Sequence, residues 1–415
     1  VTKAKSFEKS PGIRVLLYLL AGQGLFTAEG GLWKRQRKLM SPIFQPAPMH
    51  QYAETMRLVA ERAADGMRAG QTLDVAHETT RIAMSVVGKA LFDVDTFDEA
   101  DALGGALTTC LSWVNRNLAN PALVAHVLML DATEALAAKT SGGLSAFFKR
   151  AHDKVVEPFL LPGVNDPELR SAAQLLDERI QSMIDDRRKA GFQRKDLLTR
   201  LLLAEDPELG GRMSDKQARD EAITIFVAGH ETTATALAWS FYLLARHPEH
   251  FARAQAEADA FGDGPIEEWQ PEKLAFLTRV FRETMRLFPP IMMMPRRTLE
   301  EVEIAGTTLP ARTLVFVSAY AQHYRAESYP NPDAFDPDRW LPEQEATRHK
   351  SSYLPFSAGP RFCIGMHFAM MEGPIVLATL LRRWRFEIDP TPEITEDDFA
   401  TLRPRGGVQA TVRAR

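Results

Sequence analysis

Cysteine is scarce in this chain, since Cys110 and Cys363 are the only two among 415 residues. Two cysteines cannot build the disulfide framework of a secreted domain. Neither lies in a Cys-x-x-Cys pair or beside a histidine cluster, so nothing indicates zinc. The cysteine content therefore fits a reducing compartment, and we expect a cytoplasmic location.

An excess of charge of one sign is also lacking. Lys and Arg number 50 against 54 Asp and Glu, which gives a net charge of −4 and a pI near 6.3. Such a chain is not built to attract nucleic acid, and we expect no nucleic-acid partner. The first five residues have no signal-peptide layout.

Long hydrophobic runs without charge are absent too. The most apolar stretch, residues 222–244, has membrane-spanning length but carries His230, Glu231 and several hydroxyl side chains. A charged group in the middle of a bilayer is costly. The sequence therefore predicts a buried helix here and no stable membrane anchor.

Helical periodicity dominates the first three hundred residues. It predicts helices over 49–67, 73–92 and 175–188. Ser214 and Gln217 form a capping box that opens a helix running to about His247, a length of roughly 50 Å.

After Pro290 the pattern changes to short strands, predicted at 302–304, 308–309 and 314–318. A Pro-rich irregular stretch over 331–356 follows, then a helix from near Cys363 to about Arg383 and a strand-like tail at 408–412. With no repeat and no obvious linker, we expect one domain over 1–415, mainly α with a small β part.

The loop around Cys363 is the most informative segment. Its glycines permit tight turns and close approach to a flat ligand, and the helix that follows places a thiolate at a positive helix end. Arg361 can pair with an anionic group such as a carboxylate. The alternative, a buried cysteine at a turn, is disfavoured because five specified positions occur in ten residues, namely Phe356, Gly359, Arg361, Cys363 and Gly365.

This spacing resembles the haem-binding loop of the cytochrome P450 family, Phe-x-x-Gly-x-Arg-x-Cys-x-Gly, without substitution. The resemblance implies the family's fold, a large helical domain around a buried haem b (iron protoporphyrin IX), with Cys363 as the metal ligand. A thiolate ligand donates electron density to iron and favours O–O cleavage. The resemblance covers nearly the whole chain, but members usually have several dozen more residues before the helix of Trp33. We therefore expect the family's first helix and first strands to be missing.

The long helix carries Ala-Gly-His-Glu-Thr-Thr at residues 228–233. Its glycine and the polar residues after it favour a local bulge. The alternative is a regular buried helix whose hydroxyls bond back to carbonyls. The string resembles the family's Ala/Gly-Gly-x-Asp/Glu-Thr-Thr motif.

That likeness implies that Ala228 and Gly229 border the haem and make room for oxygen. It implies that Thr232 hydrogen-bonds the bound oxygen and that Glu231 passes protons inward, the two catalytic roles. An acid beside an alcohol supplies a proton relay into a dry pocket. His230 occupies the variable position of the motif and is expected to be structural.

Glu283 and Arg286 stand three residues apart on one predicted helix. Alone they could be an ordinary surface pair. The pair matches the family's Glu-x-x-Arg motif, and Arg339 matches the later arginine of the same network. The resemblance implies a buried structural network that holds the cysteine loop.

A dianionic macrocycle needs cationic or hydrogen-bonding partners at one edge. Trp33 and Arg37 match the family's Trp-x-x-x-Arg helix, Arg361 is a third candidate, and Arg296 is a fourth that Arg297 could replace. Basic side chains nearby are either a solvated face or a docking patch for an acidic electron donor. They are Lys34, Arg35 and Lys38, with Arg382 and Arg383 as a possible extension.

By resemblance, three segments should roof a substrate pocket, although core packing is the alternative for each residue. Flexible thioethers in one segment suit an adaptable apolar surface. The candidates are Leu20, Phe226, Ala228, Ile291, Met292 and Met293.

The sequence thus predicts a monooxygenase that inserts one atom of O2 into an apolar or amphipathic organic substrate, by hydroxylation or epoxidation. Electrons would come from NAD(P)H through a ferredoxin, a flavodoxin or a flavin reductase. Two alternatives stay open, a haem-thiolate peroxygenase or isomerase, and a non-catalytic haem-binding sensor. The presence of both Glu231 and Thr232 argues against them.

Overall fold

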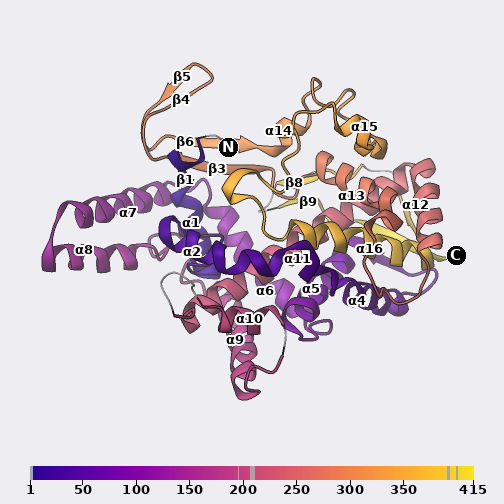
Figure 1. Ribbon diagram of the computed structural model, residues 1–415, viewed down its shortest axis with the longest axis horizontal. Coiled ribbons are helices and arrows are strands. Elements are labelled where there is room, and N and C mark those ends of the chain that lie inside the picture. The colour runs from indigo at the N-terminus through magenta and orange to yellow at the C-terminus, as the bar shows by residue number, and fades with distance from the viewer. Residues whose placement is uncertain (1–2, 195, 206–210, 390–392, 399–400) are drawn as a thin grey trace.

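Helices make up most of the chain and gather around one long helix, α11, as Figure 1 shows. The computed structural model describes residues 3–194, 196–205, 211–389, 393–398 and 401–415. The α-helices are α1 (Pro11–Ala21), α2 (Gly30–Met40), α3 (Pro46–His50), α4 (Ala53–Gly66), α5 (Val75–Phe92), α6 (Ala100–Asn117), α7 (Pro121–Lys139), α8 (Gly142–Val155), α9 (Pro167–Lys189), α10 (Leu197–Leu203), α11 (Asp215–Arg246), α12 (Pro248–Phe261), α13 (Ala275–Leu287), α14 (Ala319–His323), α15 (Pro342–Glu345) and α16 (Met366–Arg383).

The strands form small antiparallel sheets beside the helices. One sheet has the order β1-β3-β6 and a second the order β2-β10-β7, while β4-β5 and β8-β9 are pairs. The strands are β1 (Phe7–Lys9), β2 (Thr72–Asp74), β3 (Met293–Thr298), β4 (Val302–Ile304), β5 (Thr307–Leu309), β6 (Leu314–Ser318), β7 (Trp384–Ile388), β8 (Glu396–Asp398), β9 (Leu402–Pro404) and β10 (Gln409–Ala414). The predicted mainly α fold with a small β part is confirmed.

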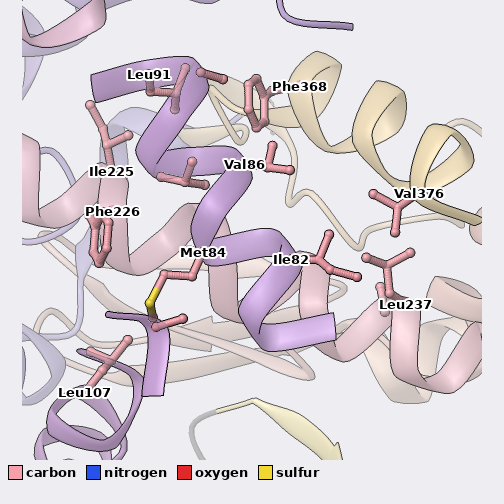
Figure 2. Close-up of a cluster of buried hydrophobic side chains, with 14 of the residues drawn as sticks. Ile82, Met84, Val86, Leu91, Leu107, Ile225, Phe226, Leu237, Phe368 and Val376 are labelled. Atoms are coloured by element: carbon pink, nitrogen blue, oxygen red, sulfur yellow. The ribbon is translucent and has the colours of Figure 1, made fainter. Parts of the chain in front are cut away.

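The core is centred on α5, which packs against α11, α4 and α6. Figure 2 shows its apolar side chains pointing in several directions: Ile82 lies beside Leu237 and Val376, and Met84 points toward Leu107. A helix that is apolar on most of its circumference is stable only when it is covered on most sides. Burial of α5 therefore fixes the position of α11, which carries the candidate oxygen-activating residues.

Three predicted helices have other bounds in the structure. The helix expected over 49–67 is divided into α3 and α4 by a turn, in which the Tyr52 N–H donates to the Met49 carbonyl. The helix expected from 73 begins at Val75, because Thr72–Asp74 pairs with β10 and the Asp74 carboxylate accepts from the Ala76 N–H as an N-cap. Periodicity alone does not reveal a cap.

The helix expected over 175–188 extends further in both directions, as α9. Asp166 caps it and Pro167 occupies its first position, where a missing N–H costs nothing. The amino-terminal segment contributes an edge strand, because β1 pairs with β3 through Glu8 opposite Arg297. Residues 7–9 therefore supply a strand to the small sheet.

The apolar run 222–244 lies inside α11, and most of its side chains are buried, as predicted. The Ser214 hydroxyl accepts from the Gln217 N–H, which is the first half of the predicted capping box. A different helix, α7, is long and apolar enough to cross a membrane, although only 22% of its most apolar window is buried.

Candidate active site

The segment before Cys363 folds back on itself as a tight loop. The Cys363 N–H donates to the Phe356 carbonyl at 2.9 Å, and the Phe362 N–H donates to the Gly359 carbonyl at 3.1 Å. Gly359 has φ +72°, a left-handed conformation that glycine adopts without strain. The loop therefore presents Cys363 just before α16 begins at Met366.

The Cys363 sulfur is crowded by protein on one side and accessible on the other, since the side chain is exposed. Desolvation raises the pKa of the thiol. The N–H groups of Gly365 and Met366 and the Arg37 guanidinium act against that rise. Such donors stabilise a thiolate and reduce its basicity. A position of Cys363 at the amino-terminal end of a helix was predicted from the sequence, and in the structure the sulfur lies beside the N–H groups at the start of α16.

A cluster of cations lies around the single carboxylate of Glu29. The Arg361 guanidinium pairs with Glu29, donates to the Ala28 carbonyl at 3.0 Å, and stacks on the Trp33 ring at 3.8 Å. Arg361 thus does pair with a carboxylate, but the partner is a protein side chain. The positive charge of Arg361 is attracted to the π-electrons of the Trp33 ring, which is a cation–π interaction.

Lys9 belongs to the same cluster and was not predicted from the sequence. Its ammonium donates to the Leu25 and Phe26 carbonyls. Burial above all, together with the nearby Arg361 and Arg296, lowers the pKa of Lys9 to about 7, although Glu29 acts in the opposite direction. Cationic groups therefore outnumber the carboxylate here, so the cluster can accept further negative charge.

The sheet decides between Arg296 and Arg297, which the sequence left open. Adjacent residues of a strand point to opposite faces. Arg297 forms ion pairs with Glu8 at 2.6 Å and Asp131 at 2.7 Å on one face of β3. Arg296 interacts instead with the Arg361 and Glu29 cluster.

The middle of α11 has an accessible stripe on an otherwise buried helix. Ala228 is exposed, and Glu231 and Thr232 are partly exposed, at the i, i+3 and i+4 positions of one face. The helix is continuously α-helical from Asp215 to Arg246, so the expected bulge does not interrupt it. Instead the Thr232 hydroxyl donates to the Ala228 carbonyl at 2.9 Å, the alternative considered from the sequence.

Gly229 has a packing role that the sequence did not indicate. A Cβ atom at this position would lie 2.9 Å from Cγ2 of Val87 on α5. Only glycine therefore lets the two helices approach this closely. This packing role is separate from the room for a ligand that was predicted for Gly229.

Glu231 is held by the C-terminal part of the chain. Its Oε1 lies 2.7 Å from the Arg403 guanidinium and accepts from the Thr401 hydroxyl at 2.9 Å. His230 beside it is buried, and its Nδ1 lies 2.8 Å from the Phe226 carbonyl. Desolvation lowers the pKa of His230, which favours a neutral ring in keeping with the expected structural role.

Glu283, Arg286 and Arg339 meet in a buried network. Arg286 and Glu283 form two hydrogen bonds, at 2.8 and 3.0 Å, and Arg339 lies 3.3 Å from Glu283. The remaining Arg286 donors reach the carbonyls of Pro332 and Ala334. A buried ion pair is tolerated when every donor and acceptor is satisfied in this way.

His323 connects this network to the cysteine loop, and sequence reasoning missed it. Its Nδ1 lies 3.0 Å from the Arg286 carbonyl, and its Nε2 accepts from the Leu354 N–H at 2.8 Å. The Leu354 carbonyl in turn accepts from the Ser357 N–H, inside the loop. No local motif surrounds His323, so only the packing of α13 against α14 reveals the connection.

Two of the predicted pocket residues are in the hydrophobic core instead. Leu20 and Phe226 are each 3% exposed. Phe226 stands about 200° around α11 from Ala228. Its ring packs edge-to-face on Phe92, and Figure 2 shows Phe226 within the cluster of buried apolar side chains. Ile291 and Met292 are half-buried, and Met293 is 45% exposed. The accessible candidates are thus Ala228 and the 291–293 segment.

The suggested extension of a basic patch by Arg382 and Arg383 is also not supported. Arg382 pairs with Asp263 at 3.0 Å, and Arg383 with Asp65 at 2.5 Å. Their charges are therefore locally balanced. Lys34 and Lys38 on α2 are exposed.

The residues present fit an iron porphyrin. An accessible thiol with N–H donors behind it suits a metal ion, and the cation-rich cluster of Arg361, Arg296 and Lys9 suits two carboxylates. The accessible face of α11 adds an acid and an alcohol. Among the described residues, no group of three or more His, Cys, Asp or Glu side chains could hold a further metal ion.

Comparisons with known proteins agree with this geometry. The family model described as Cytochrome P450 matches residues 1–412. Cyclooctatin synthase of Streptomyces melanosporofaciens is 35% identical over 396 residues, which cover 95% of this chain and 79% of that protein. Pentalenene oxygenase of Streptomyces avermitilis is 30% identical over 385 residues, covering 92% of this chain and 78% of the relative.

Solved structures extend the similarity to three dimensions. The crystal structure of the cytochrome P450DA haem domain has a TM-score of 0.78 and 25% sequence identity. The match covers 100% of this chain and 85% of that one.

Proposed function

Because this chain belongs to the cytochrome P450 family and is a haem-dependent monooxygenase, we propose that its substrate is a cyclic terpene or terpenoid alcohol. The observation that carries the proposal is the similarity to cyclooctatin synthase, pentalenene oxygenase and cyclooctat-9-en-7-ol 5-monooxygenase, all at 30–35% identity. The reaction inserts one atom of O2 into an apolar or amphipathic organic molecule.

The pocket chemistry supports a largely apolar substrate. Ala228 and Met293 are exposed, and Met292 is half-buried. The flexible methionine side chain adapts its shape to irregular apolar ligands. We assign Ile291, Met292 and Met293 to one wall of the pocket and Ala228 to another.

On the cysteine side, we propose that Cys363 binds the haem iron while Arg361, Arg296 and Lys9 hold the haem carboxylates. Trp33 orients Arg361 by stacking, and Arg37 adds positive potential near the sulfur. The bound haem supplies the iron at which O2 is reduced and split. Phe356, Gly359 and Gly365 shape the loop that lets the sulfur reach the metal.

On the α11 side, Glu231 and Thr232 move protons into the pocket. The hydrogen of the Thr232 hydroxyl is engaged by the Ala228 carbonyl, so the oxygen lone pairs of Thr232 are available to accept from a donor in the pocket. Glu231 lies at the junction between the accessible stripe and the Arg403 contact, where it can exchange protons with solvent and pass them inward.

We further propose that a ferredoxin, a flavodoxin or a flavin reductase delivers the electrons. The exposed Lys34 and Lys38 of α2 could meet an acidic donor, because positive side chains steer negative partners. Both cysteines are free thiols, which supports the cytoplasm as the location.

Substrate titration tests the terpene assignment. The haem-loaded protein is mixed with cyclic sesquiterpene and diterpene hydrocarbons and, in parallel, with straight-chain fatty acids of equal carbon number. We expect the cyclic hydrocarbons to shift the haem absorption, and turnover under 18O2 to place one labelled oxygen in the product. Tight binding of the fatty acids with no response to the terpenes would overturn the assignment.

The thiolate assignment makes a separate prediction. Cys363→Ser removes the sulfur, so the carbon monoxide adduct of the reduced protein should lose the strongly red-shifted Soret band that a thiolate ligand produces. Cys110→Ser is the matched control, because that buried thiol should leave the band unchanged. A red-shifted band that survives Cys363→Ser would mean that another residue binds the iron.

A further inference from the structure

Met293 differs from the other methionines of this chain in its exposure. All 15 methionines lie within the residues that the structure describes. The others are buried or half-buried, whereas Met293, the first residue of β3, is 45% exposed. A dissolved oxidant attacks the most accessible thioether first. Met293 is therefore the methionine of this protein that is most open to oxidation.

The pairing of β3 with β6 accounts for this exposure. The two strands lie side by side and antiparallel (Figure 1), with Met293 opposite Ser318 and Met294 opposite Val317. Residues that stand opposite each other share one face of the sheet, and adjacent residues of a strand point to different faces. The short Ser318 side chain leaves the thioether of Met293 accessible. Met294, on the other face and opposite a larger side chain, is half-buried.

The exposed thioether is close to the candidate active site. Met293 belongs to the accessible 291–293 segment, which we assign to the pocket wall. Arg296, a member of the cation cluster, follows three residues later on β3, about 10 Å along the strand. A small oxidant that forms in the pocket therefore meets Met293 before it reaches the core methionines.

Oxygen-dependent chemistry at this site provides such an oxidant. A monooxygenase uses two electrons and two protons for each molecule of O2. When oxygen insertion into the substrate fails, the same two electrons and two protons convert O2 to hydrogen peroxide. Hydrogen peroxide oxidises a thioether to a sulfoxide, and cells reverse this change with methionine sulfoxide reductases.

We propose that Met293 is a site of reversible oxidation by the hydrogen peroxide that unproductive turnover releases. One oxygen atom of the peroxide is transferred to the Met293 sulfur, so that an S–O bond forms, the O–O bond breaks and water leaves. The sulfur loses two electrons, and the peroxide gains them. The proposal rests on the monooxygenase activity and on the assignment of Met293 to the pocket wall.

Oxidation of Met293 changes the chemistry of the pocket wall. A sulfoxide is polar, and covering it with an apolar substrate is unfavourable unless a donor satisfies its oxygen. The Ser318 hydroxyl opposite is already engaged by the Met292 carbonyl and the Ala321 N–H. Oxidised protein therefore binds an apolar substrate more weakly, which makes substrate binding sensitive to the enzyme's own by-product.

Peptide mapping by mass spectrometry tests the position and the source of the oxygen. The haem-loaded full chain turns over without substrate under 18O2, with NADPH and a ferredoxin and reductase that support NADPH consumption. Cleavage after Arg286 and Arg296 releases residues 287–296 as one peptide, whose fragment masses distinguish its three methionines. We expect labelled oxygen on Met293, added at least about five-fold faster than on Met292 or Met294 because of its greater exposure.

Spectral titration with the cyclic sesquiterpene β-caryophyllene tests the consequence. Treatment with a limited amount of hydrogen peroxide, then catalase, should weaken binding by about ten-fold, and methionine sulfoxide reductases with dithiothreitol should restore it. Met293→Leu has no sulfur here, so its affinity after peroxide should equal its own affinity before peroxide, whatever that value is. Met294→Leu is the matched control and should lose affinity as the unmodified protein does.

Three outcomes would overturn the proposal. NADPH could be consumed with release of peroxide while Met293 stays unmodified, or the oxygen could be spread equally over Met292, Met293 and Met294. Binding could also weaken equally in the Met293→Leu variant, in which case peroxide damages another group. Failure of every terpene to bind would contradict the terpene assignment instead, and the peptide map would still decide for or against Met293.

Discussion

Glu231 is a candidate catalytic acid whose position depends on residues far away in the chain. Arg403 and Thr401 both contact its Oε1. They belong to a segment that leads into and through β9, and Thr401 is 170 residues from Glu231 in the chain. Arg403 acts on the accessible face of α11 through its ion pair with Glu231, so we regard it as a positioning residue for Glu231.

We predict that Arg403→Gln slows turnover by about ten-fold, less than the loss of a general acid itself would. Without the guanidinium, Glu231 is no longer held in one orientation. KM should stay nearly constant, and the solvent deuterium isotope effect on kcat should increase.

Thr232→Ala should instead release peroxide in place of product.

Arg405→Gln is the matched control, since Arg405 is exposed two residues further along and contacts Asp397 at 4.0 Å. It should keep the normal rate and isotope effect. An Arg403 variant with unchanged kcat and isotope effect would show that Glu231 needs no such partner.

At the scale of elements, the contact of α5 with α11 determines where the candidate oxygen-activating residues lie. Gly229 faces Val87 across this contact, with no room for a Cβ atom. The glycine lowers helix stability by about 1 kcal/mol relative to alanine. Its retention is explained by the close approach of the two helices.

We predict that Gly229→Ala destabilises the haem-loaded protein by about 1 to 2 kcal/mol, because overpacking in a core outweighs the gain in helix propensity. In a Val87→Ala background the new methyl group has space, so the same change should be neutral or stabilising. Urea denaturation of the four proteins measures the coupling. Equal destabilisation in both backgrounds would mean that contact with Val87 is not the cause.

At the scale of the whole molecule, His323 joins α13, α14 and the cysteine loop. Its ring must be neutral, because one nitrogen faces the Arg286 carbonyl and the other accepts from the Leu354 N–H. Burial above all, with a smaller contribution from the Arg286 charge, lowers the pKa of His323 to about 4, although the hydrogen bond to the Arg286 carbonyl opposes the shift. The unfolded chain binds this proton more readily, at a pKa near 6.5.

Stability from His323 is therefore fully present above about pH 6.5 and is lost as the pH falls toward about 4. The loss amounts to roughly 3 kcal/mol. We predict that His323→Asn lowers stability at neutral pH but flattens the pH dependence in this window by about one proton. The exposed His50→Asn should keep the original slope. A His323 variant with an unchanged slope would assign the acid sensitivity to another group.

Local patterns in the sequence were sufficient for several parts of this protein. The fold class and the strands at 302–304 and 314–318 follow from periodicity and turn residues. The cysteine loop and the Ala228–Thr233 string follow from residue types at fixed spacing. The helix carrying Glu283 and Arg286 follows from the same kind of evidence. In each case, residues close in sequence interact through the backbone geometry of one element, so spacing predicts contact.

Other features depended on the tertiary structure. Only strand pairing separates Arg296 from Arg297, and only the packing of α11 shows that Phe226 and Leu20 face the core. The contacts of Arg403 with Glu231 and of Lys9 with the arginine cluster join segments far apart in the chain. So does the bridge formed by His323. Contacts of this kind depend on which helix face is covered and by what, and burial of α5 and α11 decides that for the molecule as a whole. Sequence spacing therefore determined the residues able to do the chemistry, while packing determined which of them meet.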